Sequence, residues 1–141
     1  MSSTSTPTNT VRAGGCLCGT VRFEVTGPPD WSLWCHCRSC RLATGAPMTA
    51  WFGVRHGRWR WTGERPAFRA SSPGAERSFC SRCGTPVSFT HERWSHEIHF
   101  HTALLEDAAG FHPTGHVHFA ERLAFVAPED GLPRWEGRYG V

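Results

Sequence analysis

The sequence has no long apolar run and no lysine, and each absence excludes a class of protein. No apolar stretch approaches the ~18 residues that a membrane-spanning helix requires, so we expect no membrane segment. All 15 basic residues are arginines, and they are spread along the chain instead of forming a basic run. Nucleic-acid-binding tails are typically built from such runs, and we therefore expect no nucleic-acid partner.

An export signal is also missing from the start of the sequence. Residues 1–10 are rich in Ser and Thr and contain no apolar stretch, so they do not read as a signal peptide. We expect a disordered N-terminal tail over residues 1–10 and one domain over residues 11–141, because the length is typical of a single domain. Together with cysteines that must stay reduced, this predicts a cytoplasmic protein.

Seven cysteines fall in three tight groups, which span residues 16–18, 35–40 and 80–83. An odd number argues against a disulfide framework, and independent core cysteines would be scattered. Thiolates only a few residues apart are typical of ligands that share one metal ion. A thioredoxin-like redox motif over residues 80–83 is disfavoured, because a strand-like run follows it where such a motif would need a helix.

The way in which the seven cysteines divide predicts two different metal sites. Gly19 and Gly84 directly follow two of the groups, and glycine permits the positive-φ turn that wraps a backbone around a metal. These two similar pairs give four thiolates, which make a closed structural zinc site. The remaining three cysteines leave one coordination position of their metal open, as in catalytic zinc sites. We therefore predict two Zn²⁺ per chain: a structural zinc held by Cys16, Cys18, Cys80 and Cys83, and an open, catalytic zinc held by Cys35, Cys37 and Cys40.

The fourth ligand of the three-cysteine site stays open at this stage. His36 lies between two ligands, so its side chain should point away from their metal, but another histidine could close the site. His36 is also the candidate catalytic base beside the metal. Arg38 and Arg41 are candidates to offset the negative charge of three thiolates.

Apolar residues alternate with polar ones over residues 21–25, 59–61, 98–102 and 116–119, and this period of two predicts half-buried strands. A short helical turn is expected over residues 37–43, ending near Gly45. The numerous Trp and Phe residues should pack the core, although Trp51 and Phe52 could line a pocket. A further group of histidines is expected on a solvated face, with metal binding as the alternative: His96, His99, His101, His116 and His118.

The three cysteine groups and their flanking residues resemble those of the glutathione-dependent formaldehyde-activating enzyme family, which includes centromere protein V-like proteins. The resemblance covers roughly residues 15–89 and carries Cys-Leu-Cys-Gly, Cys-His-Cys-Arg-Ser-Cys-Arg and Phe-Cys-Ser-Arg-Cys-Gly-Thr-Pro in that order. Residues 130–135, Asp-Gly-Leu-Pro-Arg-Trp, are similar to the family's C-terminal segment.

The resemblance implies a mainly β, zinc-bound fold called the β-tent, with short helical turns. It implies the same division of the cysteines between a structural and a catalytic zinc. The implied activity is that of a carbon–sulfur lyase acting on a thiol–aldehyde adduct, as in S-(hydroxymethyl)glutathione synthase, with glutathione and formaldehyde as small-molecule partners. Candidates to bind the carboxylates of glutathione are then Arg38, Arg41 and Arg55.

Two other functions fit the same cysteines. One is a non-enzymatic, zinc-stabilised interaction module in which both metals are structural. The other is a thiol and zinc redox sensor, in which oxidants release the metal from the three-cysteine group. We rank the enzyme first because an open coordination position suits chemistry better than scaffolding.

Overall fold

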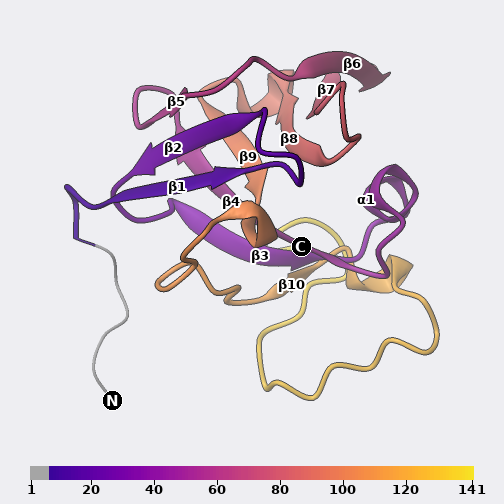
Figure 1. Cartoon of the computed structure of the whole chain (residues 1–141). Helices are drawn as coiled ribbons and strands as arrows, with labels where there is room; N and C mark the ends of the chain where they lie inside the picture. The colour runs from indigo at the N-terminus through magenta and orange to yellow at the C-terminus, as the bar shows by residue number, and fades with distance from the viewer. Residues whose placement is uncertain (1–6) are drawn as a thin grey trace.

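The computed structural model describes residues 7–141, which are built mainly from β-strands (Figure 1). Within these residues there are ten strands, one α-helix and three 3₁₀ turns. The prediction of a mainly β, single-domain fold with short helical turns is therefore confirmed. None of the described helices is long and apolar enough to cross a membrane.

The strands form two sheets. The small, antiparallel sheet has the order β1-β2-β5, with β1 (Val11–Gly15), β2 (Arg22–Thr26) and β5 (Trp59–Trp61). The large sheet has the order β10-β3-β4-β9-β8-β7-β6, and β10 is parallel to β3 while the other pairs are antiparallel. Its strands are β3 (Trp31–Cys35), β4 (Thr49–Arg55), β6 (Ala67–Ser72), β7 (Ala75–Phe79), β8 (Pro86–His91), β9 (Glu97–His101) and β10 (His116–Val117).

The main core lies between the two sheets, where the small sheet covers one face of the large one (Figure 1). Phe23 of β2 stacks on Phe100 of β9, with ring centroids 4.1 Å apart. Phe52 and Val54 of β4 are fully buried in the same cluster. Burial of each such side chain stabilises the fold by ~1.5–3 kcal/mol, which fixes the position of one sheet on the other.

The opposite face of the large sheet carries the residues of chemical interest. Strand register places Cys35 opposite Thr49, and Trp51 opposite His101, so these side chains point to the same side. The same alternation continues through Phe89 of β8 to Arg77 of β7. We call this side the site face, and its members are Leu33, Cys35, Thr49, Trp51, Arg77, Phe89, Glu97, His99 and His101.

The helix α1 (Arg38–Thr44) lies where a helical turn was predicted. The thiol of Cys37 caps its first turn by accepting a hydrogen bond from the backbone N–H of Cys40. Gly45 ends the helix with φ of 77°, a left-handed conformation that glycine adopts without strain. The helix therefore holds two of the predicted metal ligands in a fixed relation.

The predicted strands differ from the observed ones mainly near the C-terminus. β2, β5 and β9 lie within one residue of the predicted ranges. β10 ends at Val117, because His118 adopts φ of 52° and leads into the 3₁₀ turn η3 (Phe119–Glu121). The other short turns are η1 (Glu92–Trp94) and η2 (Thr102–Leu104).

The last residues run back beside β10 without forming a helix or a named strand (Figure 1). The N–H of His116 donates to the carbonyl of Pro133 over 2.9 Å, and the N–H of Trp135 donates to the carbonyl of His116 over 2.8 Å. Of the predicted N-terminal tail, residues 1–6 lie outside the described residues. Residues 7–10 form a turn in which Thr10 donates to the carbonyl of Pro7.

Candidate metal centre

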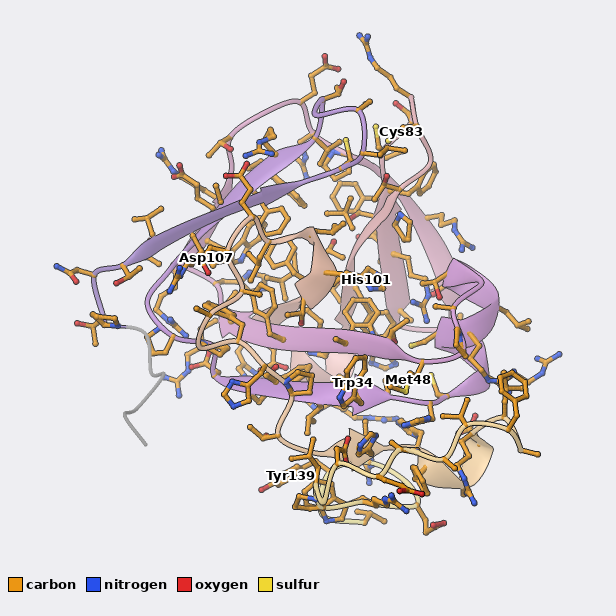
Figure 2. All side chains as sticks on the ribbon, turned by 60° about the horizontal axis from the view of Figure 1, so that its bottom comes forward. Trp34, Met48, Cys83, His101, Asp107 and Tyr139 are labelled. Atoms are coloured by element: carbon orange, nitrogen blue, oxygen red, sulfur yellow. The ribbon has the colours of Figure 1, made fainter. Side chains whose placement is uncertain are left out.

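Four cysteines from two distant turns meet at one end of the molecule. Cys16 and Cys18 lie in the turn between β1 and β2, and Cys80 and Cys83 lie in the turn between β7 and β8. Their four sulfur atoms lie within 4.8 Å of one another. The Sγ–Sγ distances are 3.6 Å from Cys16 to Cys18 and 3.7 Å from Cys18 to Cys80. Cys83 is labelled at the upper end of Figure 2.

The two turns have the same backbone geometry. Gly19 and Gly84 both have φ of 81°, and their N–H groups donate to the carbonyls of Cys16 and Cys80 over 3.1 and 2.8 Å. Each turn also directs backbone N–H groups at sulfur, as from Val21 to the Cys16 Sγ over 3.3 Å. Such donors stabilise thiolate over thiol, which is the form that binds a metal.

This group fits a tetrahedral metal ion. Zinc–sulfur bonds of ~2.3 Å require sulfur atoms about 3.8 Å apart at the corners of a tetrahedron. The two closest Sγ–Sγ distances, 3.6 and 3.7 Å, agree with that spacing, and all seven cysteines are free of disulfides. The four-cysteine cluster (Cys16, Cys18, Cys80 and Cys83) could therefore hold one metal ion.

A second cluster forms where β3 enters α1. Cys35 ends β3, Cys37 caps the helix and Cys40 lies in its first turn. The three sulfur atoms lie within 4.8 Å of one another, and those of Cys35 and Cys40 are 3.8 Å apart. Within residues 7–141 no fourth His, Cys, Asp or Glu atom joins this three-cysteine cluster. It too could hold a metal ion, with one coordination position left for another ligand.

The three thiols of this cluster share negative charge unequally. Hydrogen bonds from the thiols of Cys35 and Cys37, and the nearby guanidinium of Arg77, lower the pKa of Cys40. The same interactions with thiolate neighbours raise the pKa of Cys35. The guanidinium of Arg77 therefore favours the thiolate form at Cys40.

Arg77 is the cation that the fold places at this cluster. Its Nη2 lies 3.8 Å from the Cys40 Sγ, and its guanidinium carbon lies 4.9 Å from the centre of the Phe89 ring. Although only 8 % of Arg77 is exposed, the described residues offer it no carboxylate partner. The positive charge of Arg77 therefore acts on Cys40 and on the neighbouring His101.

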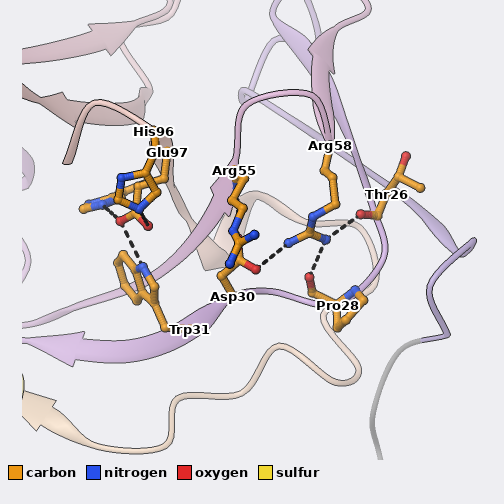
Figure 3. A network of polar contacts seen from close by, with 9 residues as sticks. Thr26, Pro28, Asp30, Trp31, Arg55, Arg58, His96 and Glu97 are labelled. Carbon is orange, nitrogen blue, oxygen red and sulfur yellow. Dashed lines mark hydrogen bonds and ion pairs between the residues drawn. The ribbon is translucent and has the colours of Figure 1, made fainter.

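The arginines predicted from sequence proximity lie elsewhere. Arg41 of α1 donates to the backbone carbonyl of Glu121, and the backbone N–H of Arg38 donates to the Glu121 carboxylate. Arg55 ends β4 at the opposite end from Thr49, with its side chain 73 % exposed and paired with Asp30 (Figure 3). A strand of this length places Arg55 roughly 20 Å from the cluster.

His101 lies on the site face beside the cluster. Its ring stacks on Trp51 with centroids 3.8 Å apart. Burial lowers the pKa of His101 to about 4, while the negative charge of Cys40 acts in the opposite direction. The imidazole is therefore neutral near pH 7. His101 is labelled near the centre of Figure 2.

A second polar pair continues the site face away from the cysteines. The Nε2 of His99 lies 2.6 Å from the Oε2 of Glu97, which also accepts a 3.0 Å hydrogen bond from the indole of Trp31 (Figure 3). His99, His101 and His116 are all buried. The expectation of a solvated histidine face therefore fails for these three, because the aromatic rings of Trp51, Trp94 and Phe119 pack against them.

His36 is fully buried on the side of the sheet opposite to Cys35. Its Nε2 lies 2.8 Å from Nδ1 of His116, whose Nε2 lies 2.8 Å from Oδ2 of Asp130. Burial and the nearby His116 lower the pKa of His36 to about 4. The ring thus points away from the thiols between which it stands in sequence, as its position predicts.

Comparisons with known proteins find a matching family model, similar sequences and a similar fold. Residues 11–121 match the family model described as glutathione-dependent formaldehyde-activating enzyme. A Halomonas elongata protein named "Putative glutathione-dependent formaldehyde-activating enzyme" is 26% identical, over 91% of this chain and 96% of its own length. A Schizosaccharomyces pombe protein named as an uncharacterized lyase is 34% identical over 55% of this chain and 56% of its own length.

A solved structure of a Rhodobacter sphaeroides protein has the same fold. It aligns with a TM-score of 0.55 and 22% sequence identity, covering 87% of this chain and 98% of that one. The family match includes all three cysteine groups, and therefore both clusters that the fold brings together.

Proposed function

Because the chain belongs to the glutathione-dependent formaldehyde-activating enzyme family, we propose that it is a zinc-dependent carbon–sulfur lyase acting on a thiol–aldehyde adduct. The reaction is of the S-(hydroxymethyl)glutathione synthase type, with glutathione and formaldehyde as the thiol and aldehyde. The observation that carries this proposal is the three-cysteine cluster, which has no fourth ligand within residues 7–141 and lies beside Arg77 and His101.

The two clusters have different tasks in this proposal. The four-cysteine cluster holds a structural Zn²⁺, and Cys35, Cys37 and Cys40 hold a second Zn²⁺ with one position open. A metal ion in such an open site supplies a Lewis acid and stabilises a bound thiolate. The need for seven reduced thiols supports a cytoplasmic location.

Arg77 adjusts the charge of the open cluster. Three thiolates around a divalent ion leave a net negative charge, which would repel a thiolate or carboxylate of the substrate. The Arg77 guanidinium, 3.8 Å from the Cys40 Sγ, offsets this charge from a buried position. The site face therefore accepts an anionic thiol better than the cysteines alone would.

His101 is the proton acceptor in our proposal. Cleavage of the adduct breaks its C–S bond and moves the hydroxyl proton to the sulfur, so that an aldehyde and a thiol leave; addition is the reverse. His101 is neutral at pH 7, so its lone pair is available to accept this proton from oxygen, and its pKa of about 4 favours onward transfer of the proton to sulfur. The stack on Trp51 fixes the orientation of the ring.

Thr49 offers a hydrogen bond on the same face. Its hydroxyl is buried opposite Cys35 and has no hydrogen-bond partner within the described residues. A buried hydroxyl without a partner is costly, so a ligand oxygen that pairs with it gains affinity. We assign Thr49 to the oxygen of the adduct.

The catalytic role predicted for His36 stays a prediction. Its ring lies on the other side of the sheet and bonds to His116, whereas His101 faces the cluster. We therefore place the proton acceptor at His101 and give His36 a positioning role.

The proposal is tested by nuclear magnetic resonance with ¹³C-labelled formaldehyde and glutathione. Exchange spectroscopy measures the rate at which label moves between hydrated formaldehyde and the S-hydroxymethyl adduct. We expect zinc-loaded protein to accelerate this exchange, and His101→Phe to slow the catalysed rate by ~10²-fold or more, as for the loss of an acid–base group.

His112→Phe is the matched control, since His112 is exposed and distant in sequence from both clusters. The proposal is wrong if protein with metal at both clusters accelerates neither this exchange nor that of other thiol–aldehyde pairs. It is also wrong for His101 if the two variants retain equal rates.

A further inference from the structure

A hydrogen-bonded chain of three side chains joins the C-terminal segment to the three-cysteine cluster. It runs from Asp130 through His116 to His36, with two contacts of 2.8 Å. Asp130 lies beyond the residues that the family model matches, which end at residue 121. None of the three side chains points to the site face, so none has a role in the chemistry proposed above.

The chain fixes the orientation of each ring. A carboxylate can only accept, so Nε2 of His116 donates to Asp130. Nδ1 of His116 and Nε2 of His36 share one proton, so one of these two nitrogens donates to the other. Nδ1 of His36 is buried without a partner within the described residues, so the ring is held by this one bond.

Packing encloses both imidazoles. The Phe119 ring meets His36 edge-on at 5.1 Å and His116 at 5.8 Å. The guanidinium groups of Arg122 and Arg134 also lie over the Phe119 ring, at 4.4 and 4.7 Å from its centroid. With both histidines fully buried, the loss of one hydrogen bond would leave polar atoms unpaired in a closed space.

His36 stands between Cys35 and Cys37, so a fixed ring also fixes the backbone that carries both thiols. The N–H of His36 is itself bonded to the carbonyl of Val117 over 3.1 Å. Partners beyond the ligand residues orient them, and their loss typically costs 10–100-fold in metal affinity.

We propose that Asp130 and His116 are positioning residues, which act through His36 to hold Cys35 and Cys37 in the arrangement that binds the metal. The segment around Asp130 is then part of the metal centre, although it lies about 90 residues from the cysteines in sequence. This inference rests on the proposed function, in which the three-cysteine cluster holds zinc.

The test measures zinc release from each cluster without substrate. Zinc-loaded protein is mixed with a chromogenic chelator, and cysteines are alkylated at intervals and identified by mass spectrometry. Asp130→Ala should release zinc from Cys35, Cys37 and Cys40 about 10–100-fold faster, while the four-cysteine cluster keeps its wild-type rate. The Asp130 side chain is 34% exposed, so its removal should leave the fold intact.

Two further variants sharpen the test. Asp130→Asn retains an oxygen that can accept from His116 and should recover most of the wild-type rate. Glu129→Ala, at the exposed neighbouring residue, should release zinc as slowly as the wild type.

Equal release rates in Asp130→Ala and wild type overturn the inference and leave the proposed function standing. Faster release from both clusters in Asp130→Ala also overturns it, because that would mark a general loss of stability. If the wild type binds no zinc at the three-cysteine cluster, the inference and the proposed function both fail.

Discussion

At the scale of single residues, the site combines groups that sequence proximity identifies with groups that it does not. The cysteines can be recognised as metal ligands from their spacing, because ligands of one metal must lie close together. Arg77 and His101 carry no such signal, since they meet the cluster only through the register of β7, β8, β9 and β4. Arg38 and Arg41 are near in sequence, yet the Arg38 N–H and the Arg41 side chain bond to Glu121 and not to the thiols.

The buried state of His101 makes the stability of the protein depend on pH. Its pKa of about 4 in the folded protein lies below the ordinary 6.5. As the pH falls, the unfolded chain therefore takes up a proton at this histidine before the folded protein does. His101 does not reduce the unfolding free energy above pH 6.5, but it reduces it progressively as the pH falls towards 4. We expect the unfolding free energy of His101→Gln to fall by about 2 kcal/mol less than that of the wild type between pH 6.5 and 4.5.

Denaturant unfolding of zinc-saturated protein at several pH values measures this difference. His112→Gln serves as the control, because His112 is exposed and should leave the wild-type pH dependence unchanged. Parallel pH profiles for wild type and His101→Gln would show that His101 is protonated equally in the folded and unfolded states.

At the scale of elements, α1 and the strands β2, β5, β8, β9 and β10 were predictable, whereas β1, β3, β4, β6 and β7 were not predicted. The period of two in β2, β5 and β9, and the Gly45 stop of α1, depend on local sequence alone. The early end of β10 was not predictable, because the left-handed backbone of His118 depends on contacts with the C-terminal segment, where its N–H meets the carbonyl of Gly137. The order in which the strands pair could likewise not be predicted from local sequence patterns.

The two cysteine turns depend on glycine, as the sequence predicted. Gly84 has φ of 81°, and a Cβ added there would meet no atom within 4 Å. The destabilisation caused by a substitution at Gly84 therefore comes from the backbone conformation alone. We expect Gly84→Ala to lower the unfolding free energy by ~1–2 kcal/mol, and Gly84→Asn by less, since asparagine tolerates this conformation.

Urea unfolding of the zinc-loaded variants measures this cost. Gly137→Ala is the matched control, because Gly137 has no positive φ and a Cβ there would meet nothing closer than 3.7 Å. An equal effect of the two Ala substitutions would mean that the positive φ of the turn does not determine the loss.

At the scale of the whole molecule, the two clusters differ in what they connect. The four-cysteine cluster joins the turn between β1 and β2 of the small sheet to the turn between β7 and β8 of the large sheet. The three-cysteine cluster joins only β3 to the adjoining helix. A metal in the first cluster is therefore a cross-link between sheets, and a metal in the second is a local feature.

This difference predicts opposite effects for two similar substitutions. Structural zinc contributes ~10–16 kcal/mol in small peptides, against a net stability of ~5–15 kcal/mol for a typical domain. Cys18→Ser should therefore unfold much of the protein, and a strong chelator should do the same to the wild type.

Cys37→Ser should retain the fold and one zinc per chain but lose the catalysed exchange. Far-ultraviolet circular dichroism, zinc per chain and exchange rate, measured on the same preparations, separate the cases. Unchanged dichroism after both metals are removed would show that the core between Phe23 and Phe100 holds the sheets together without the cross-link.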